Sequence, residues 1–196
     1  MKLILASSSP RRAEILRNAG FDFEVAPAGV DESQRHGEYA TNLVRRLAEE
    51  KARAVAQQIA ARSPNKSGII VAADTVVDVE GEILGKPSSP DDARAMLCRL
   101  SGRTHEVLTA LAVLPIPGNQ SRVVVESARV TFALLTEREI EEYIQSGEPF
   151  GKAGAYAIQG HGGKFITRIE GCYFNVMGLP LARLYAILRE LSTERG

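Results

Sequence analysis

The chain has 196 residues and carries 24 lysines and arginines against 24 aspartates and glutamates, so its formal net charge is zero. This balance and the absence of tryptophan argue against a nucleic-acid binder, which needs a basic surface and aromatic side chains that stack on bases. No apolar stretch is long enough to span a bilayer, and the first residues lack the apolar core of a signal peptide, so we expect a cytoplasmic protein without membrane or nucleic-acid partners.

The first seventeen residues predict a strand, a hydroxyl-rich turn and a helix. The apolar run 3–6 leads into Ser7-Ser8-Ser9, whose last residue is the expected N-cap, and Pro10 suits the first helical position. Arg11 and Arg12 occupy the first turn, where the helix macrodipole favours acidic side chains instead. Two cations there indicate an anion site such as a phosphate cradle. A solvated arginine pair beside an ordinary cap explains them equally well.

A strand over residues 21–25 leads to Asp31 and Glu32, which by themselves are typical of solvated loop acids. A long amphipathic helix follows over residues 38–61. Lys51 lies in the middle of the apolar stripe of this helix. Its stem could snorkel to solvent, or the ammonium could be held on a buried face to bind a phosphate.

The residues 69–73 are continuously apolar, which predicts a central strand covered on both faces, and Asp74 stands at the end of this run. Open α/β sheets place their active residues at the carboxyl ends of such strands. A buried carboxylate needs a metal ion, lysine or arginine nearby to stay ionised. A cap or a structural ion pair is the other reading of a lone aspartate. A hairpin over residues 76–83, with Glu80-Gly81 at its tip, is expected next.

The remaining segments predict scaffold elements around one glycine-rich loop. The loop covers residues 151–163 and contains Gln159, whose amide suits recognition of a pyrimidine edge or of an attacking water. The scaffold elements are a helix capped by Ser89 and ended by Gly102, paired strands over 107–114 and 122–134, a helix over 136–147 opened by a capping box, a hairpin over 165–173, a turn over 175–180 and a terminal helix over 181–191.

Neither the cysteines nor the histidines have the spacing of a metal site. Cys98 lies in a helical pattern and Cys172 in an expected late strand, so both are predicted to be reduced and structural. His36, His105 and His161 are separated by long stretches of chain and have no ligand spacing.

Several strings of this sequence resemble the motifs of the Maf family of nucleoside triphosphate pyrophosphatases, and the resemblance covers nearly the whole chain. The strings are LASSSPRR at 5–12, EKA at 50–52, ADT at 73–75, GKP at 85–87, AGAY at 153–156 and IQG at 158–160.

The resemblance implies a role for each matching residue. Asp74 would be the catalytic base, and Glu32 with Asp74 would bind a divalent metal cation, Mg²⁺ or Mn²⁺. Glu32 is the closer match to the acidic position of the family, and Asp31 is its alternative. The substrate phosphates would be bound by Ser7, Arg11, Arg12, Lys51 and Lys86.

Three positions distinguish the substrate types within the family, and here they are Arg11, Thr75 and Gln159. This combination resembles the type that hydrolyses dTTP and UTP. The 7-methyl-GTP type instead has an aromatic residue after the proline, a glutamine after the aspartate and a glutamate in place of Gln159.

We therefore expect an α/β fold of the Maf/ITPase-like kind, with an elongated mixed β-sheet flanked by helices. The resemblance implies a single domain over residues 1–196 with two lobes around a cleft, the segment 103–150 belonging to the second lobe. The expected enzyme releases pyrophosphate from nucleoside triphosphates, including modified pyrimidine nucleotides, and a homodimer is one form it could take. A nucleotide-binding regulator of septum formation is the alternative from another functional class, and a member with 7-methyl-GTP specificity is the alternative within the family.

Overall fold

The computed structural model describes residues 2–118 and 120–193. Its elements in chain order are β1 (Leu3–Leu5), α1 (Pro10–Asn18), β2 (Phe23–Val25), α2 (Ala40–Arg62), β3 (Gly68–Val79), β4 (Glu82–Leu84), α3 (Pro90–Leu100), β5 (Thr104–Ile116), β6 (Arg122–Phe132), α4 (Glu137–Gln145), the 3₁₀ turns η1 (Ala153–Ala155) and η2 (His161–Phe165), β7 (Ile166–Glu170), α5 (Tyr173–Met177) and α6 (Leu181–Thr193).

The chain forms two compact units, and three strands contribute residues to both. The described residues of Met1–Asp74, Thr109–Glu126 and Gly178–Gly196 form the first unit, and Thr75–Leu108 with Ser127–Met177 form the second. The strands with residues in both are β3, β5 and β6.

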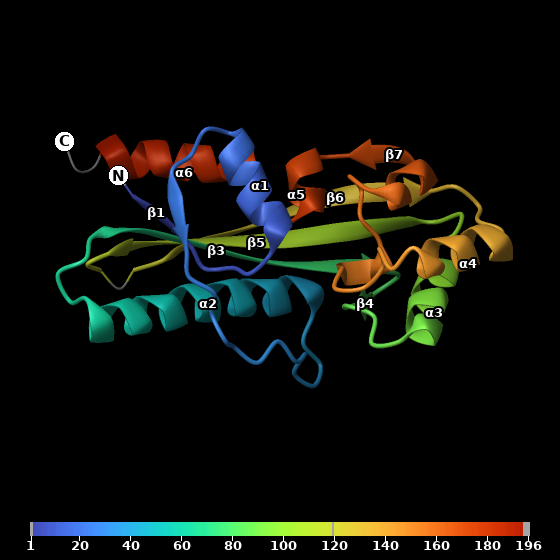
Figure 1. Cartoon of the computed structure of the whole chain (residues 1–196), viewed down its shortest axis with the longest axis horizontal. Coiled ribbons are helices and arrows are strands. Elements are labelled where there is room, and N and C mark those ends of the chain that lie inside the picture. The colour runs from blue at the N-terminus through green and yellow to red at the C-terminus, as the bar shows by residue number, and fades with distance from the viewer. Residues whose placement is uncertain (1, 119, 194–196) are drawn as a thin grey trace. The chain divides into compact units, whose positions relative to one another are not determined.

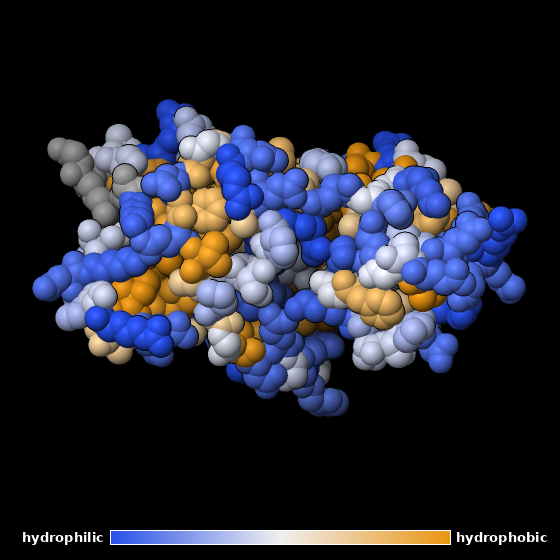
Figure 2. All heavy atoms as spheres, in the orientation of Figure 1, coloured by the Kyte–Doolittle hydropathy of each residue, from blue (hydrophilic) through white to orange (hydrophobic). Residues whose placement is uncertain are grey.

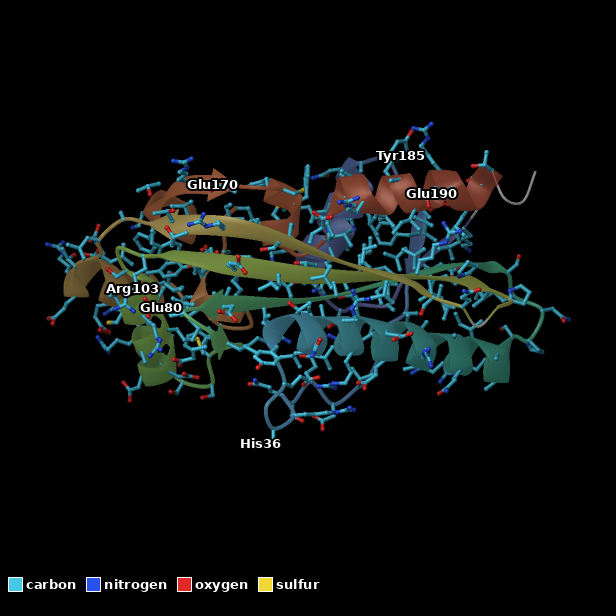
Figure 3. All side chains as sticks on the ribbon, turned by 180° about the vertical axis from the view of Figure 1, so that it is seen from behind. His36, Glu80, Arg103, Glu170, Tyr185 and Glu190 are labelled. Carbon is cyan, nitrogen blue, oxygen red and sulfur yellow. The ribbon has the colours of Figure 1, made fainter. Side chains whose placement is uncertain are left out.

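The first unit contains a sheet in the order β2-β1-β3-β5-β6, in which β1 pairs in parallel with β2 and β3. Leu3 of β1 is opposite Phe23 on one side and Ile69 on the other. Helix α2 lies on one side of these strands, and α1 and α6 lie on the opposite side (Figures 1 and 3). Helices on both sides explain why β1 and the first half of β3 are continuously apolar and buried.

The second unit contains strands in the order β4-β3-β5-β6-β7, with antiparallel pairs β3/β4 and β6/β7. The turn between β3 and β4 has positive φ at both Glu80 (54°) and Gly81 (83°), as a tight hairpin of the type I′ class requires. The core of this unit contains Leu97 of α3, Ile140 of α4 and Phe165. Parallel and antiparallel pairs in one sheet, with helices beside it, confirm the expected mixed α/β fold.

The predicted starts of α1, α3 and α4 are borne out, with one difference in the capping of α1, whereas α2 begins at Ala40 rather than at residue 38. The Ser89 side chain accepts a hydrogen bond from the Asp92 amide, and Thr136 forms a capping box with Glu139. Ser9 occupies the N-cap position of α1, but its side chain makes no capping bond. The Ser9 amide instead donates to the hydroxyl oxygen of Ser7.

Two strand predictions are wrong. Asp74 does not end its strand, because β3 continues to Val79 in order to pair with β4. The hairpin expected over residues 165–173 is a single strand, β7, whose partner is β6, far away in the sequence. Cys172 consequently lies between β7 and α5 rather than in a strand, and the turn expected from residue 175 begins inside α5. Both cysteines are free thiols.

His105 is buried in the second unit with only 2% of its surface exposed. Its Nε2 atom lies 2.9 Å from the hydroxyl of Tyr156, and its ring stacks edge-on against Phe132 with the centroids 5.2 Å apart. Burial lowers the pKa of His105 to about 4. The folded protein therefore keeps this imidazole neutral under conditions in which the unfolded chain binds a proton.

This difference predicts an acid-sensitive stability. Since the pKa of His105 falls from 6.5 to about 4 on folding, the free energy of unfolding should fall by about 3 kcal/mol as the pH is lowered from 6.5 to 4. Urea unfolding across this range should show the loss in the wild type and much less of it in His105→Gln. The exposed His36, which lies on the loop after β2 (Figure 3), provides the control, because His36→Gln keeps His105 and should keep the loss. The prediction would be contradicted if the free energy of unfolding of His105→Gln fell with pH as steeply as that of the wild type.

Candidate functional site

The end of β1 and the start of α1 are joined by the side chains of Ser7 and Arg12. Leu5 is the last residue of β1 paired with β3, and Ser7, two residues later, is 7% exposed. The Ser7 hydroxyl oxygen accepts from the Ser9 amide at 3.2 Å and from Arg12 Nη1 at 3.0 Å. Arg12 Nε also donates to the carbonyl of Gly178 at 2.8 Å. The hydroxyl-rich turn is thus fixed to the helix that follows it.

The electrostatic surroundings of Arg12 include two of the three acidic candidates from the sequence, Asp74 and Glu32. Burial lowers the pKa of the Arg12 guanidinium, and the negative charge of Asp74 opposes this effect. The neighbouring Arg11 lowers this pKa further, and Glu32 raises it. Arginine remains charged in proteins despite such shifts. The site therefore holds a permanent positive charge within the electrostatic influence of two carboxylates.

Lys51 connects those two carboxylates. It projects from the buried face of α2, and only 6% of its surface is exposed. Its Nζ atom lies 2.6 Å from Oδ1 of Asp74 and 2.6 Å from Oε1 of Glu32. The alternative in which Lys51 reaches solvent is wrong, because the ammonium is turned toward the acids. The cation expected near Asp74, which is itself 7% exposed, is present.

The loop that carries Glu32 is anchored to α2 by Arg46, which our sequence reading did not single out. Arg46 Nη2 donates to the carbonyl of Ser33 at 3.0 Å, and its guanidinium forms two hydrogen bonds with Glu38, at 2.7 and 2.8 Å. Hydrogen bonding to Arg46 lowers the pKa of Glu38 to about 2. The i,i+4 pair of Arg46 with Glu50 was the available sequence signal, but such pairs are common on exposed helices.

Asp31 and Glu32 have different surroundings, although they are neighbours in the sequence. Asp31 Oδ1 accepts from the Ser33 amide at 2.9 Å, and this hydrogen bond lowers the pKa of Asp31. Glu32 instead contacts Lys51. In Figure 2 the tip of this loop is hydrophilic, and a small apolar patch lies beside it. The geometry favours Glu32 over Asp31 as the acid that acts with Asp74.

Arg11 lies beside Arg12 in α1, and the remaining candidates, Thr75, Lys86 and Gln159, lie in the second unit. Thr75 follows Asp74 in β3 and is half-buried, and Lys86 is exposed in the segment between β4 and α3. Gln159 is exposed in the turn between η1 and η2. The amide of Gly154 donates to the carbonyl of Gly85 at 3.0 Å, so the segments that carry Lys86 and Gln159 are hydrogen-bonded to each other. That these residues share one pocket with Arg11, Lys51 and Asp74 stays a prediction.

The described residues contain no cluster of three or more histidine, cysteine, aspartate or glutamate side chains suited to a metal ion. Glu32 and Asp74 nevertheless approach a single nitrogen from different elements, and carboxylate oxygens are suitable ligands for a hard divalent cation. Magnesium is commonly bound through one or two carboxylates together with substrate phosphates. The pair therefore fits a metal site that the substrate completes.

In the part of the chain that the structure describes, every helix is too short or too polar to cross a membrane.

Comparison with known proteins shows that this chain matches a family model and is similar to individual relatives over nearly its whole length. A family model described as "Maf-like protein" matches residues 2–191. A dTTP/UTP pyrophosphatase of Carboxydothermus hydrogenoformans is 49% identical over 193 residues, which cover 97% of this chain and 98% of that protein. A dTTP/UTP pyrophosphatase of Hahella chejuensis is 48% identical, over 98% of this chain and 94% of that protein. Among solved structures, the Staphylococcus aureus Ham1 protein aligns with a TM-score of 0.44 and 16% identity over 68% of this chain and 72% of its own.

The contacts of Lys51 predict a large stability effect. Lys51→Met should reduce the free energy of unfolding by about 3–5 kcal/mol, because Asp74 would stay buried without its ammonium partner. Urea unfolding measures the loss, and Lys51→Met combined with Asp74→Asn should recover part of it. Arg53→Met, which removes an exposed ion pair from the same helix, is the matched control and should cost about 1 kcal/mol or less. Equal losses in the two single variants would refute a special role for the buried pair.

Proposed function

Because this chain belongs to the family of Maf-like proteins, we infer that it is a nucleoside triphosphate pyrophosphatase. It hydrolyses dTTP and UTP to the monophosphate and pyrophosphate, and so removes unwanted nucleotides from the cellular pool. The observation that carries this conclusion is the 49% identity to a dTTP/UTP pyrophosphatase over almost the full length of both chains. The cluster of Arg12, Lys51, Asp74 and Glu32 supplies the charges that such a reaction needs.

We assign the binding of the triphosphate to the cations and to the turn before α1. Arg11 and Arg12 lie in the first turn of that helix, which has no acidic residue to compete with a phosphate. Ser7 fixes Arg12 beside the turn, and Lys51 adds a buried positive charge. Lys86 is the fifth proposed contact, by its match to the family motif.

We assign the role of general base to Asp74. Lys51 donates a hydrogen bond to Oδ1 at 2.6 Å, which holds the carboxylate of Asp74 in place. In the proposed step Asp74 accepts a proton from water while the water oxygen forms a bond to the α-phosphorus. The bond between the α-phosphorus and the bridging oxygen breaks, and pyrophosphate leaves with that oxygen. The positive side chains offset the negative charge that develops on the phosphates.

We propose that Glu32 and Asp74, with phosphate oxygens of the substrate, hold Mg²⁺ or Mn²⁺. A bound divalent cation would neutralise phosphate charge and polarise the phosphorus–oxygen bonds. Glu32 has 44% of its side chain exposed, so it is accessible to an incoming substrate and its ion, whereas Asp74 is nearly buried. Lys51 lies between the two acids and would hold them in place before the substrate binds.

We assign base selection to Arg11, Thr75 and Gln159. The amide of Gln159 offers a donor and an acceptor, which match the acceptor and donor on the edge of uracil or thymine. Its side chain is exposed, so it is accessible to a ligand. A preference for 7-methyl-GTP would need the different residues of that type at these positions.

A nucleotide-binding regulator is the competing function. It would bind the nucleotide without hydrolysing it and would therefore need no general base at Asp74.

We also place the enzyme in the cytoplasm, where its proposed substrates are found. The two lobes around a cleft, the assignment of residues 103–150 to the second of them and the homodimer stay predictions.

A nucleotide panel tests the proposed function. The purified protein with Mg²⁺ should release pyrophosphate fastest from dTTP and UTP, and more slowly from dCTP, purine triphosphates and 7-methyl-GTP. Asp74→Asn should fold and lose at least about 100-fold in kcat, because it lacks a general base. Binding without pyrophosphate release would favour the regulator, and purines hydrolysed faster than dTTP and UTP would overturn the substrate assignment.

A metal titration tests the role of Glu32. Glu32→Gln should raise the Mg²⁺ concentration that gives half-maximal activity by at least about tenfold, since even outer-sphere partners of a metal commonly contribute that much. Saturating Mg²⁺ should restore most of kcat. Asp31→Asn is the control from the neighbouring position and should leave the Mg²⁺ requirement nearly unchanged. If Asp31→Asn shifts the titration and Glu32→Gln does not, the ligand is Asp31.

A further inference from the structure

The turn that carries Gln159 is held by Glu148, a residue to which the proposed reaction assigns no role. Glu148 lies between α4 and η1, and its carboxylate accepts three hydrogen bonds within the second unit. The His161 amide donates to Oε2 at 2.9 Å, and the Gly162 amide donates to Oε1 at 3.0 Å. The hydroxyl of Tyr143 also donates to Oε1, at 2.8 Å.

Tyr143 fixes the other end of the same turn. Its ring belongs to α4, is 2% exposed and packs edge-on against Phe165 with the centroids 5.2 Å apart. Its hydroxyl oxygen accepts from the Ala157 amide at 3.2 Å. The backbone is therefore held at Ala157 by Tyr143 and at residues 161–162 by Glu148, and Gln159 lies between these anchors.

Two glycines let these side chains lie directly against the backbone. A Cβ atom at Gly160 would overlap the carboxylate of Glu148, and one at Gly162 would lie 2.7 Å from the hydroxyl oxygen of Tyr143. Neither position has room for a larger residue unless the anchors move. The contact is therefore close enough for a small displacement of the anchors to change the path of the turn.

The charge of Glu148 suits this arrangement. Burial raises the pKa of its carboxyl group, but the hydrogen bonds from Gly162, His161 and Tyr143 outweigh burial and hold this pKa below its ordinary value. An ionised carboxylate accepts all three bonds, whereas an amide has one oxygen and would point an NH₂ group at a donor. Glutamine at position 148 would therefore loosen the turn without changing its size.

We propose that Glu148 and Tyr143 are positioning residues for base selection, which hold the 157–162 turn so that the Gln159 amide faces the pyrimidine edge. The proposal rests on the proposed function and extends it to residues that touch no substrate. Gln159 is exposed, so the direction of its side chain depends on the backbone that these two residues fix. The phosphate contacts proposed for Ser7, Arg12 and Lys51 belong to the first unit and do not involve these anchors.

The predicted effect is a loss of discrimination rather than of chemistry. In Glu148→Gln, the ratio of kcat/KM for dTTP to that for dGTP should fall at least about tenfold, mostly through a higher KM for dTTP, because a displaced amide leaves polar groups of the base unpaired. The kcat for dTTP should stay within about threefold of the wild type, because the base Asp74 is unchanged. Tyr143→Phe removes one donor to Glu148 and the acceptor for Ala157, and should act in the same direction.

A double-mutant cycle with Gln159→Ala tests the proposal. If Glu148 acts through Gln159, adding Glu148→Gln to Gln159→Ala should leave the dTTP/dGTP ratio unchanged. Glu142→Gln, which alters an exposed ion pair of α4, is the control and should keep wild-type selectivity. Thermal unfolding verifies that each variant is folded, and Tyr143→Phe takes the place of Glu148→Gln in the cycle if the latter fails to fold.

The outcomes separate this proposal from the function on which it rests. A wild type that releases no pyrophosphate from dTTP or UTP would remove both. An active wild type whose Glu148→Gln and Tyr143→Phe variants keep full selectivity would overturn only the positioning role. An equal fall in kcat for all nucleotides would also overturn the positioning role. The same holds if Glu148→Gln still changes the selectivity when Gln159 has been replaced by alanine.

Discussion

The buried ammonium of Lys51 is the interaction on which the candidate site depends. A lysine that is nearly inaccessible to water must be paired, and here it is bonded to Asp74 of β3 and to Glu32 of the loop before α2. These contacts bring together three segments that are distant in the sequence. They also keep two acids close to each other, which is unfavourable without a cation between them. The same need for positive charge makes the acid pair suitable for a divalent metal ion, which could in turn bind phosphate oxygens.

The first helix illustrates how stability is given up at such a site. Helices α3 and α4 have acidic residues in the first turn and side-chain caps, which is the stabilising arrangement. Helix α1 has arginines there and no side-chain capping bond. Charges opposed to the macrodipole cost up to about 1 kcal/mol each at an exposed end, and the hydrogen bonds of Arg12 to Ser7 and Gly178 offset part of this cost. A bound phosphate would make the two arginine charges at this helix end stabilising instead of destabilising.

The second unit uses buried polar groups in a different way. His105 with Tyr156, and Tyr143 with Glu148, are polar pairs set within or beside an aromatic core. Each pair fixes the orientation of its two side chains more closely than apolar packing alone would, because a hydrogen bond needs its partner at a particular distance and angle. The first pair holds the segment 153–162 at Tyr156, and the second holds its backbone at Ala157 and Gly162, so the path of this glycine-rich segment is defined.

The sequence by itself predicted most of the elements and supplied most of the candidate residues. Apolar runs and helical periodicity identified the strand before Ser7 and the helix with Lys51 in its apolar stripe, because these patterns are local. The family motifs added Glu32, Lys86 and Gln159. Only the tertiary structure decided that Lys51 pairs with Asp74 and Glu32, that β7 pairs with β6, and that Arg46 and Glu148 anchor the loops. The contacts of Lys51 with Asp74 and of β7 with β6 join residues far apart in the chain, and those of Arg46 and Glu148 join residues of neighbouring segments. Hydrogen bonds of either kind leave no periodic pattern in the sequence.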